Sequence, residues 1–183
     1  PPMPTAVAAP TDENSLGGAW EATKEGLIEP ILVGPEATIR EEAAKLGWDL
    51  AGVRIEPVST AHDAPARCVS LVHEGRAEAV MKGNIHSDEV LRHVTKSDGG
   101  LRAGRRISHV FVLDIPGHEG LMLITDAAIN ILPDLMTKAD IVQNAIDLAH
   151  IIGIAEPKVA ILSSVETGNP NIQSTLDAAA LCK

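Results

Sequence analysis

The chain has few aromatic residues and few basic ones. Its aromatic residues are Trp20, Trp48 and Phe111, and it contains no tyrosine. Proteins that bind single-stranded nucleic acid stack the bases on aromatic side chains, so this composition disfavours that class. Lys and Arg number 15 against 25 Asp and Glu, which gives a formal net charge of -10. Because a nucleic-acid surface needs broad positive charge, we expect no nucleic-acid partner.

The chain also has little cysteine and no long apolar run. Cys68 and Cys182 are too far apart for a metal or redox motif, and we expect two reduced thiols in a cytoplasmic protein, with Cys68 packed in the core. The seven histidines do not group into a metal site. No segment has the length of a bilayer-spanning run, and no signal peptide is visible. We therefore expect no metal and no membrane partner.

What the chain does contain is an alternation of strands and helices. Its hydrophobic content of 45% is mostly Ala, Val, Ile and Leu, which suits parallel strands covered by helices. Strands are expected at 5–9, 31–33, 53–58, 79–81 and 158–163, and helices at 12–27, 36–46, 64–74, from 87 onward and at 135–149. This order predicts a three-layer α/β fold with a mostly parallel sheet. Apolar runs at 109–114 and 121–125 flank a Pro-Gly turn and predict an antiparallel hairpin that joins the sheet.

The expected domain boundary follows the helix that stops at Gly153. We expect a first α/β domain over residues 1–153 and the start of a second α/β domain over residues 154–183. The last strand and helix have no later element to pack against. The second domain is therefore expected to be only partly present, and the chain incomplete.

Positive charge gathers in one part of this acidic chain. Between Lys82 and Arg106 lie six Lys and Arg residues against three acids, so the segment carries about +3. It follows an apolar strand that ends at Lys82-Gly83 and precedes a helix that begins near Ser87. Ligands of open α/β sheets bind outside the carboxyl ends of the strands. The segment is therefore interpreted as a small-anion site.

Each residue of this segment also has a structural interpretation. Lys82 supplies a point charge and Gly83 permits close approach of a ligand, or the two form an ordinary tight turn. Asn84, His86 and Ser87 carry donors for an anion, and the helix N-cap is the preferred role for Ser87.

Further polar residues follow other strands or turns. Asp126 and Asn130 either line a cleft or cap a following helix, and Ser163, Ser164 and Thr167 either repeat the carboxyl-end placement or are turn hydroxyls. The arginines at 102, 105 and 106 either reach a ligand phosphate or form a charged surface turn, and Arg105 is preferred over Arg106.

Several ordered motifs together resemble a known family. The chain is similar to the phosphate acetyltransferase and phosphate butyryltransferase family, and most of all to the branch found alone or fused behind an enoyl-CoA hydratase-like domain. The likeness runs from about Thr5 to Leu181. Its motifs are Lys82-Gly-Asn-Ile-His86, Leu91-Arg92, Ser108-His109, Thr125-Asp-Ala-Ala-Ile-Asn130 and Pro157-Lys-Val-Ala-Ile-Leu-Ser163.

The resemblance implies a two-domain fold related to the isocitrate and isopropylmalate dehydrogenases, with a cleft between the domains. It implies an acyltransferase that interconverts acyl-CoA plus phosphate with acyl phosphate plus coenzyme A. It also implies a homodimer and no permanently bound cofactor, with coenzyme A and acyl-CoA as substrates. Family members run beyond residue 183, and their final third carries a second arginine and an aspartate used in catalysis.

The family's loop-helix motif places the phosphate-binding, catalytic arginine at Arg92. The alternative is a solvated helix residue that pairs with Asp88, four positions earlier. Lys82, Gly83, Asn84, His86 and Arg105 are expected to bind phosphate with it. Asp126, Asn130, Ser163, Ser164 and Thr167 are expected to border the coenzyme A side.

Without a GxSxG elbow or a P-loop, we expect the coenzyme A thiol to attack the acyl phosphate directly. Two other functions stay open. One is a truncated segment that binds phosphate or coenzyme A without turnover, and the other is a metal-dependent hydroxy-acid dehydrogenase of the same fold.

Overall fold

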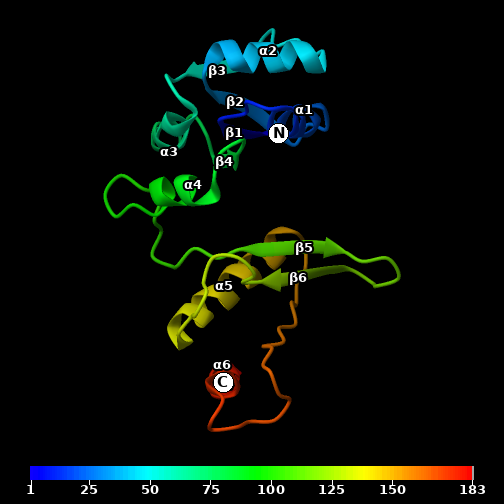
Figure 1. The fold of residues 1–183 in the computed structure, drawn as a ribbon. Helices are drawn as coiled ribbons and strands as arrows, with labels where there is room; N and C mark the ends of the chain where they lie inside the picture. Colours follow the sequence, from blue (N-terminus) through cyan, green and yellow to red (C-terminus); the bar gives the residue numbers. More distant parts are fainter. Residues whose placement is uncertain (183) are drawn as a thin grey trace. The chain divides into compact units, whose positions relative to one another are not determined.

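The computed structural model describes residues 1–182. Contacts divide the chain into two compact units, Pro1–Arg102 and Ala103–Lys183, which we term the first and second units. The domain boundary expected after residue 153 stays a prediction. The elements in chain order are β1 (Met3–Ala8), α1 (Glu13–Lys24), β2 (Ile28–Gly34), α2 (Glu36–Leu46), β3 (Arg54–Pro57), the 3-10 helix η1 (Ala61–Asp63), α3 (Ala64–His73), β4 (Ala79–Lys82), α4 (Ser87–Val94), β5 (Val110–Asp114), β6 (Leu121–Thr125), α5 (Leu135–Ile151) and α6 (Gln173–Leu181) (Figure 1).

The first unit is built on a four-stranded sheet of order β3-β2-β1-β4. All three strand pairs are parallel, and Ala8 of β1 lies opposite both Val33 of β2 and Lys82 of β4. The predicted mostly parallel α/β fold is thereby confirmed. Because the strands are parallel, the loops after β1, β3 and β4 all leave the same edge of the sheet.

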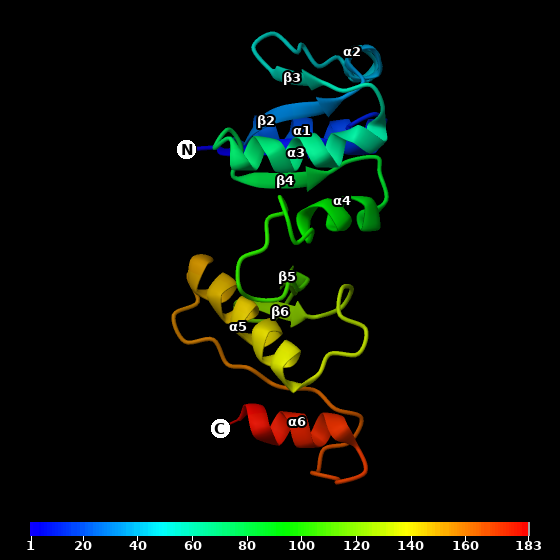
Figure 2. The same cartoon turned by 90° about the vertical axis from the view of Figure 1, so that its left-hand side faces the viewer.

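Helices cover both faces of this sheet. One buried cluster joins Val7 and Leu32 to the helices α1 and α2, and a second joins residues such as Ala8 and Ile31 to α3 (Figure 2). Neighbouring residues of a strand enter opposite clusters because side chains alternate across a sheet. Both faces are therefore apolar, as expected for parallel strands between helices.

Two element boundaries in the first unit differ by three residues from the expected ones. The first helix ends at Lys24 rather than at Leu27, and β2 begins at Ile28 rather than at Ile31. Gly26 at φ 68° turns the chain between them, a conformation that glycine adopts without steric cost. The strand β2 is longer than expected because its first residues pair with the start of β1, Met3 opposite Ile28.

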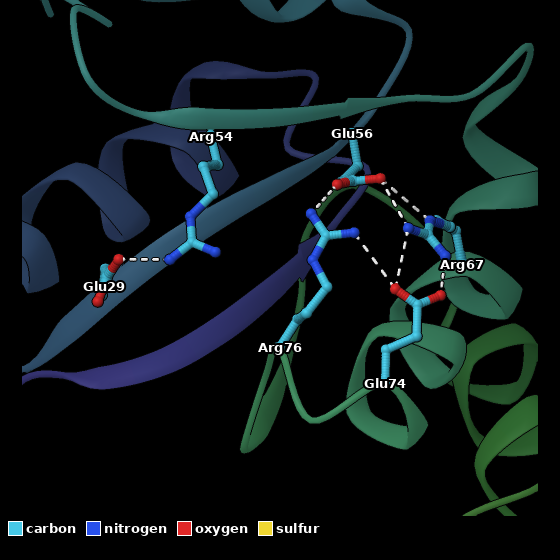
Figure 3. Close-up of polar contacts among 6 residues, drawn as sticks. All are labelled: Glu29, Arg54, Glu56, Arg67, Glu74 and Arg76. Atoms are coloured by element: carbon cyan, nitrogen blue, oxygen red, sulfur yellow. Dashed lines mark hydrogen bonds and ion pairs between the residues drawn. The ribbon is translucent and has the colours of Figure 1, made fainter.

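A network of ion pairs holds the edge strand β3 to its neighbours (Figure 3). Glu56 of β3 accepts hydrogen bonds from Arg67 of α3, with Nη2 at 2.8 Å, and from Arg76 in the loop before β4. Both guanidinium groups also bind Glu74. Burial acts to raise the pKa of Glu56, but the hydrogen bonds from Arg67 and Arg76 outweigh it and hold the pKa below its usual value. The network therefore stabilises the charged form of Glu56.

The second unit contains the predicted hairpin. Strands β5 and β6 pair antiparallel, with Val110 opposite Thr125 and Asp114 opposite Leu121. The expectation that this hairpin joins the parallel sheet is wrong for residues 1–182, where β5 and β6 form a separate two-stranded sheet. The helix α5 packs beside β6, and its N-terminus is capped by Asp134, which accepts from the Thr137 backbone N–H at 2.8 Å.

The expected strand at 158–163 is also wrong. This segment has no regular structure, and Leu162 is 87% exposed. A strand needs a neighbour for its backbone N–H and C=O groups. Within the described residues no strand pairs with this apolar run, so hydrophobicity alone does not order it.

Candidate functional site

A pocket of about 540 Å³ opens at the carboxyl edge of the parallel sheet. Its lining comes from the segment after β1 with the first turn of α1, from η1 after β3, and from the end of β4 through the first turn of α4. The lining residues are Asp12, Asn14, Ser15, Ala61, His62, Lys82, Gly83, Asn84, Ile85, His86 and Glu89. Four of the residues expected to bind phosphate (Lys82, Gly83, Asn84 and His86) are thus brought together in one pocket.

The floor of this pocket depends on close packing between the ends of β1 and β4. The backbone N–H groups of Gly83 and Asn84 donate to the carbonyls of Ala8 and Ala9, both at 2.8 Å. A Cβ atom at Gly83 would lie 2.5 Å from the Ala8 carbonyl oxygen. Ala9 itself has φ 51°, in the left-handed region that is costly for a residue with a side chain. Gly83 is therefore required by the packing of the backbone.

The ammonium group of Lys82 is engaged by its own loop. Its Nζ donates to the carbonyl oxygens of Gly83 at 3.2 Å and Ile85 at 3.1 Å. These contacts hold the positive charge at the pocket, where it also lowers the pKa of Asp12 by Coulombic attraction. Both interpretations of Lys82, a turn residue and a point charge, fit this geometry.

Asp12 brings a carboxylate to the same pocket. It is the N-cap of α1 and accepts a hydrogen bond from the Ser15 backbone N–H at 2.9 Å, together with one from the Ser15 hydroxyl. These two hydrogen bonds are the main reason that the pKa of Asp12 lies below its usual value. Ionised Asp12 also interacts favourably with the positive end of the α1 dipole.

His62 and Glu89 form a second polar pair in the pocket. The His62 Nδ1 is in hydrogen-bond contact with Glu89 Oε2, which links η1 to the first turn of α4. The Glu89 side chain is 15% exposed, whereas the His62 side chain is 76% exposed. The pair therefore lies at the rim of the pocket, with the carboxylate on its inner side.

Arg92 lies on α4 but does not line the pocket. Its side chain is exposed, and within residues 1–182 it makes neither an ion pair nor a hydrogen bond. The alternative pairing with Asp88 is therefore not formed. Arg92 follows the pocket residue Glu89 by three positions, so the two share one face of the helix.

The remaining expected residues belong to the second unit. Arg105 forms an ion pair with Asp147 of α5, with Nη2 2.5 Å from Oδ2. Ser163 exchanges a hydrogen bond with Ser174 at 2.7 Å, while Ser164 and Thr167 are exposed. These contacts show where the side chains lie, and the roles expected for them stay predictions.

Asp126 organises the turn after β6. Its carboxylate accepts from the backbone N–H groups of Ala128, Ile129 and Asn130 and from the Asn130 side chain. Burial acts to raise its pKa, but these hydrogen bonds outweigh burial and lower it. Residues 127–132 form bends rather than a helix, so the alternative that Asp126 and Asn130 cap a following helix is wrong.

The other chemistry-bearing groups have clear positions. Cys68 is completely buried on α3, as expected for a core residue, and burial raises the pKa of its thiol to about 12. Among residues 1–182, no three His, Cys, Asp or Glu side chains are grouped to hold a metal ion. No helix in that range combines the length and apolar character needed to cross a bilayer.

Sequence reasoning missed five polar lining residues: Asp12, Asn14, Ser15, His62 and Glu89. The signal was present, because Asp12 and His62 follow β1 and β3 just as Gly83 and Asn84 follow β4. The rule that ligands bind outside the carboxyl ends of parallel strands applies equally to all three loops.

These features define the class of the protein: a parallel α/β protein with a polar pocket at the carboxyl ends of its strands. Residues 56–183 match the profile of the Phosphate acetyl/butaryl transferase family. The chain therefore belongs to the phosphate acetyl/butaryl transferase family.

Individual relatives agree with this assignment. The whole chain is 58% identical to a phosphate acetyltransferase of Rhizobium meliloti, and 97% of it is 41% identical to a phosphate butyryltransferase of Clostridium acetobutylicum. A branched-chain phosphotransacylase from Enterococcus faecalis V583 has a similar structure, with a TM-score of 0.78 and 28% identity over 98% of this chain and 63% of that one. The chain spans 58% and 59% of the length of the two sequence relatives.

Proposed function

We propose that this protein is a phosphate acyltransferase that interconverts acyl-CoA plus inorganic phosphate with acyl phosphate plus coenzyme A. The observation that carries the proposal is the Lys82–His86 loop. In a chain of this family, it lies at a pocket outside the carboxyl ends of three parallel strands. The relatives' names support acetyl and butyryl groups as the acyl class.

The reaction that we propose is a direct transfer. The coenzyme A sulfur attacks the carbonyl carbon of the acyl phosphate, a C–S bond forms, and the C–O bond to phosphate breaks. The thiol proton leaves to a base, and phosphate departs with the bonding electron pair. Cationic donors that hold the phosphate oxygens lower the energy of the charge that develops on this leaving group.

Within this scheme, Arg92, Lys82, Gly83, Asn84, His86 and Arg105 are the proposed phosphate-binding residues. Arg92 suits the central role because its planar guanidinium can donate to two phosphate oxygens and its side chain makes no ion pair within residues 1–182. Arg105 would first have to leave its ion pair with Asp147.

The proposed coenzyme A side consists of Asp126, Asn130, Ser163, Ser164 and Thr167. We further propose that the fold is related to the isocitrate and isopropylmalate dehydrogenases, with domains meeting near residue 153. We also propose that the protein acts as a cytoplasmic homodimer without a permanently bound cofactor.

The test is formation of acetyl-CoA from acetyl phosphate and coenzyme A by wild type and by Arg92→Ala. Loss of a charge-assisted hydrogen bond is worth about 1.5–3 kcal/mol, so kcat/KM for acetyl phosphate should fall by about 10- to 150-fold. Arg40→Ala is the matched control, because Arg40 is an exposed arginine paired with Glu36 on α2.

Unchanged turnover in Arg92→Ala would remove this arginine from the mechanism. A wild-type protein that binds phosphate and coenzyme A but forms no acetyl-CoA would instead be the non-catalytic binding segment.

A further inference from the structure

The contact between His62 and Glu89 has no part in the proposed reaction, yet both residues line its pocket. They come from different loops, since His62 follows β3 and Glu89 follows β4. A pair formed between two such loops at a ligand pocket can orient a side chain toward the ligand.

The backbone around His62 is held firmly. Thr60 and Asp63 form a capping box about η1: Asp63 Oδ2 accepts from the Thr60 backbone N–H at 3.0 Å and from its hydroxyl at 2.8 Å. The capping box therefore fixes the backbone around His62, and the contact with Glu89 fixes the orientation of its ring.

The contact with Glu89 also determines what the imidazole offers to a ligand. An ionised carboxylate only accepts hydrogen bonds, so Nδ1 must carry the proton that joins the two groups. In a neutral ring, the other nitrogen, Nε2, then has a free lone pair. In its neutral form the ring therefore presents Nε2 as an acceptor that takes a hydrogen bond from a ligand N–H, O–H or S–H group.

The other polar groups of the pocket are engaged differently. The carboxylate of Asp12 caps α1, and the ammonium of Lys82 donates to carbonyls of its own loop. His86 makes no side-chain cap and, among the described residues, has no carboxylate partner. His62 is thus the imidazole of this pocket whose orientation a carboxylate fixes.

We infer that His62 is a further substrate-contacting residue of this pocket, that Glu89 positions it, and that it binds a neutral hydrogen-bond donor on the thiol-bearing arm of coenzyme A. This inference rests on the proposed function for the identity of the substrate. Phosphate oxygens are unsuitable partners for the neutral ring of His62, because the lone pair at Nε2 and the negative charge of Glu89 both repel them. The amide, hydroxyl and thiol groups of that arm are neutral donors.

The first test is the protonation pattern of the His62 ring, read from long-range ¹H–¹⁵N NMR correlations of the protein. Wild type should carry the ring proton on Nδ1. Glu89→Gln should keep this pattern, because its amide oxygen still accepts, and Glu89→Leu should lose it. A wild-type ring that carries a proton on Nε2 at neutral pH, alone or together with one on Nδ1, would overturn the inference.

The second test is calorimetric binding of coenzyme A, pantetheine and inorganic phosphate. His62→Ala should raise the Kd for coenzyme A and pantetheine by about three- to tenfold, the value of one neutral hydrogen bond, and should leave the Kd for phosphate unchanged. Glu89→Leu should raise the same two Kd values by as much as His62→Ala does, and Glu89→Gln should resemble wild type. The His62→Ala/Glu89→Leu double variant should show no further loss of affinity. His118→Ala, in the exposed β5–β6 turn, is the control.

These results separate the inference from the proposed function. An unchanged coenzyme A affinity in His62→Ala contradicts the inference, and it does so even if the wild type forms acetyl-CoA as the proposed function requires. The expected binding pattern without acetyl-CoA formation contradicts the proposed function but supports the contact of His62 with coenzyme A. If wild type binds neither coenzyme A nor pantetheine, both fail.

Discussion

At the residue scale, the pocket requires glycine at position 83, because any side chain there would clash with the backbone of β1. Gly83 is buried between Lys82 and Asn84, and its own N–H is bonded to the end of β1. The loop can therefore carry its polar side chains close to the sheet only because position 83 has no Cβ. The same constraint makes this residue a direct probe of the pocket.

Gly83→Ala should destabilise the first unit by about 1–3 kcal/mol, the usual cost of overpacking a closed site. The new Cβ would lie 2.5 Å from the Ala8 carbonyl oxygen and 2.7 Å from that of Ala9, and neither backbone group can move freely. Urea unfolding followed by the fluorescence of Trp20 and Trp48 measures this change. Gly18→Ala is the control, because Gly18 lies inside α1 with open space around it and should gain stability by about 0.5–1 kcal/mol. Equal stability of Gly83→Ala and wild type would contradict the close packing.

At the element scale, α1 begins at the pocket and depends on Asp12 for its cap. Asp12→Ala should lower the free energy of unfolding by about 1 kcal/mol at neutral pH, because the Ser15 N–H loses its acceptor. The pKa of Asp12 is lowered in the folded protein from the ordinary value of 3.8. The ionised cap therefore stabilises the fold fully above about pH 4 and loses this contribution as the pH falls through the folded-state pKa.

Asp12→Asn isolates that effect, since asparagine caps well but does not titrate. As the pH is lowered from about 7 to about 3, the free energy of unfolding of Asp12→Asn should increase relative to that of wild type. A difference that stays constant over this range would show that the charge of Asp12 contributes nothing to the cap.

At the scale of the whole molecule, buried residues are distributed unevenly between the two units. Both hydrophobic clusters of the described residues lie in the first unit. In the second unit the buried residues are few, and the exposed ones include Ile131 at 92% and Leu162 at 87%. Segments with few buried contacts open at a lower free energy than a packed core.

Limited trypsin digestion should therefore cleave first in the second unit and in the segment before it. Lys158 lies in an exposed irregular segment, and Arg105 and Arg106 lie in an exposed stretch before β5. A fragment that contains β1 to α4 should persist, as measured by intact mass spectrometry over time. Early cleavage within residues 1–94, before any cut at Lys158, would contradict this order of stability.

The amino-acid sequence was sufficient to predict the local elements of the first unit and the loop that follows β4. Its short apolar runs, each followed by a helix, predict parallel strands covered on both faces, because such strands have no polar side. The strand that ends at Lys82-Gly83 predicted the polar loop, because ligands bind outside the carboxyl ends of such strands. These features depend on neighbouring residues in the chain, so they can be read without the fold.

Which loops share the pocket, and which apolar runs become strands, depends on contacts that form in the folded protein. Asp12, His62 and Glu89 are far apart in sequence and meet only because β1, β3 and β4 end at one edge of the sheet. Residues 158–163 look as strand-like as residues 31–33, yet only the latter have a neighbour to pair with in the described chain. Hydrogen bonds between strands join distant parts of the chain, and local hydrophobic pattern carries no information about the partner.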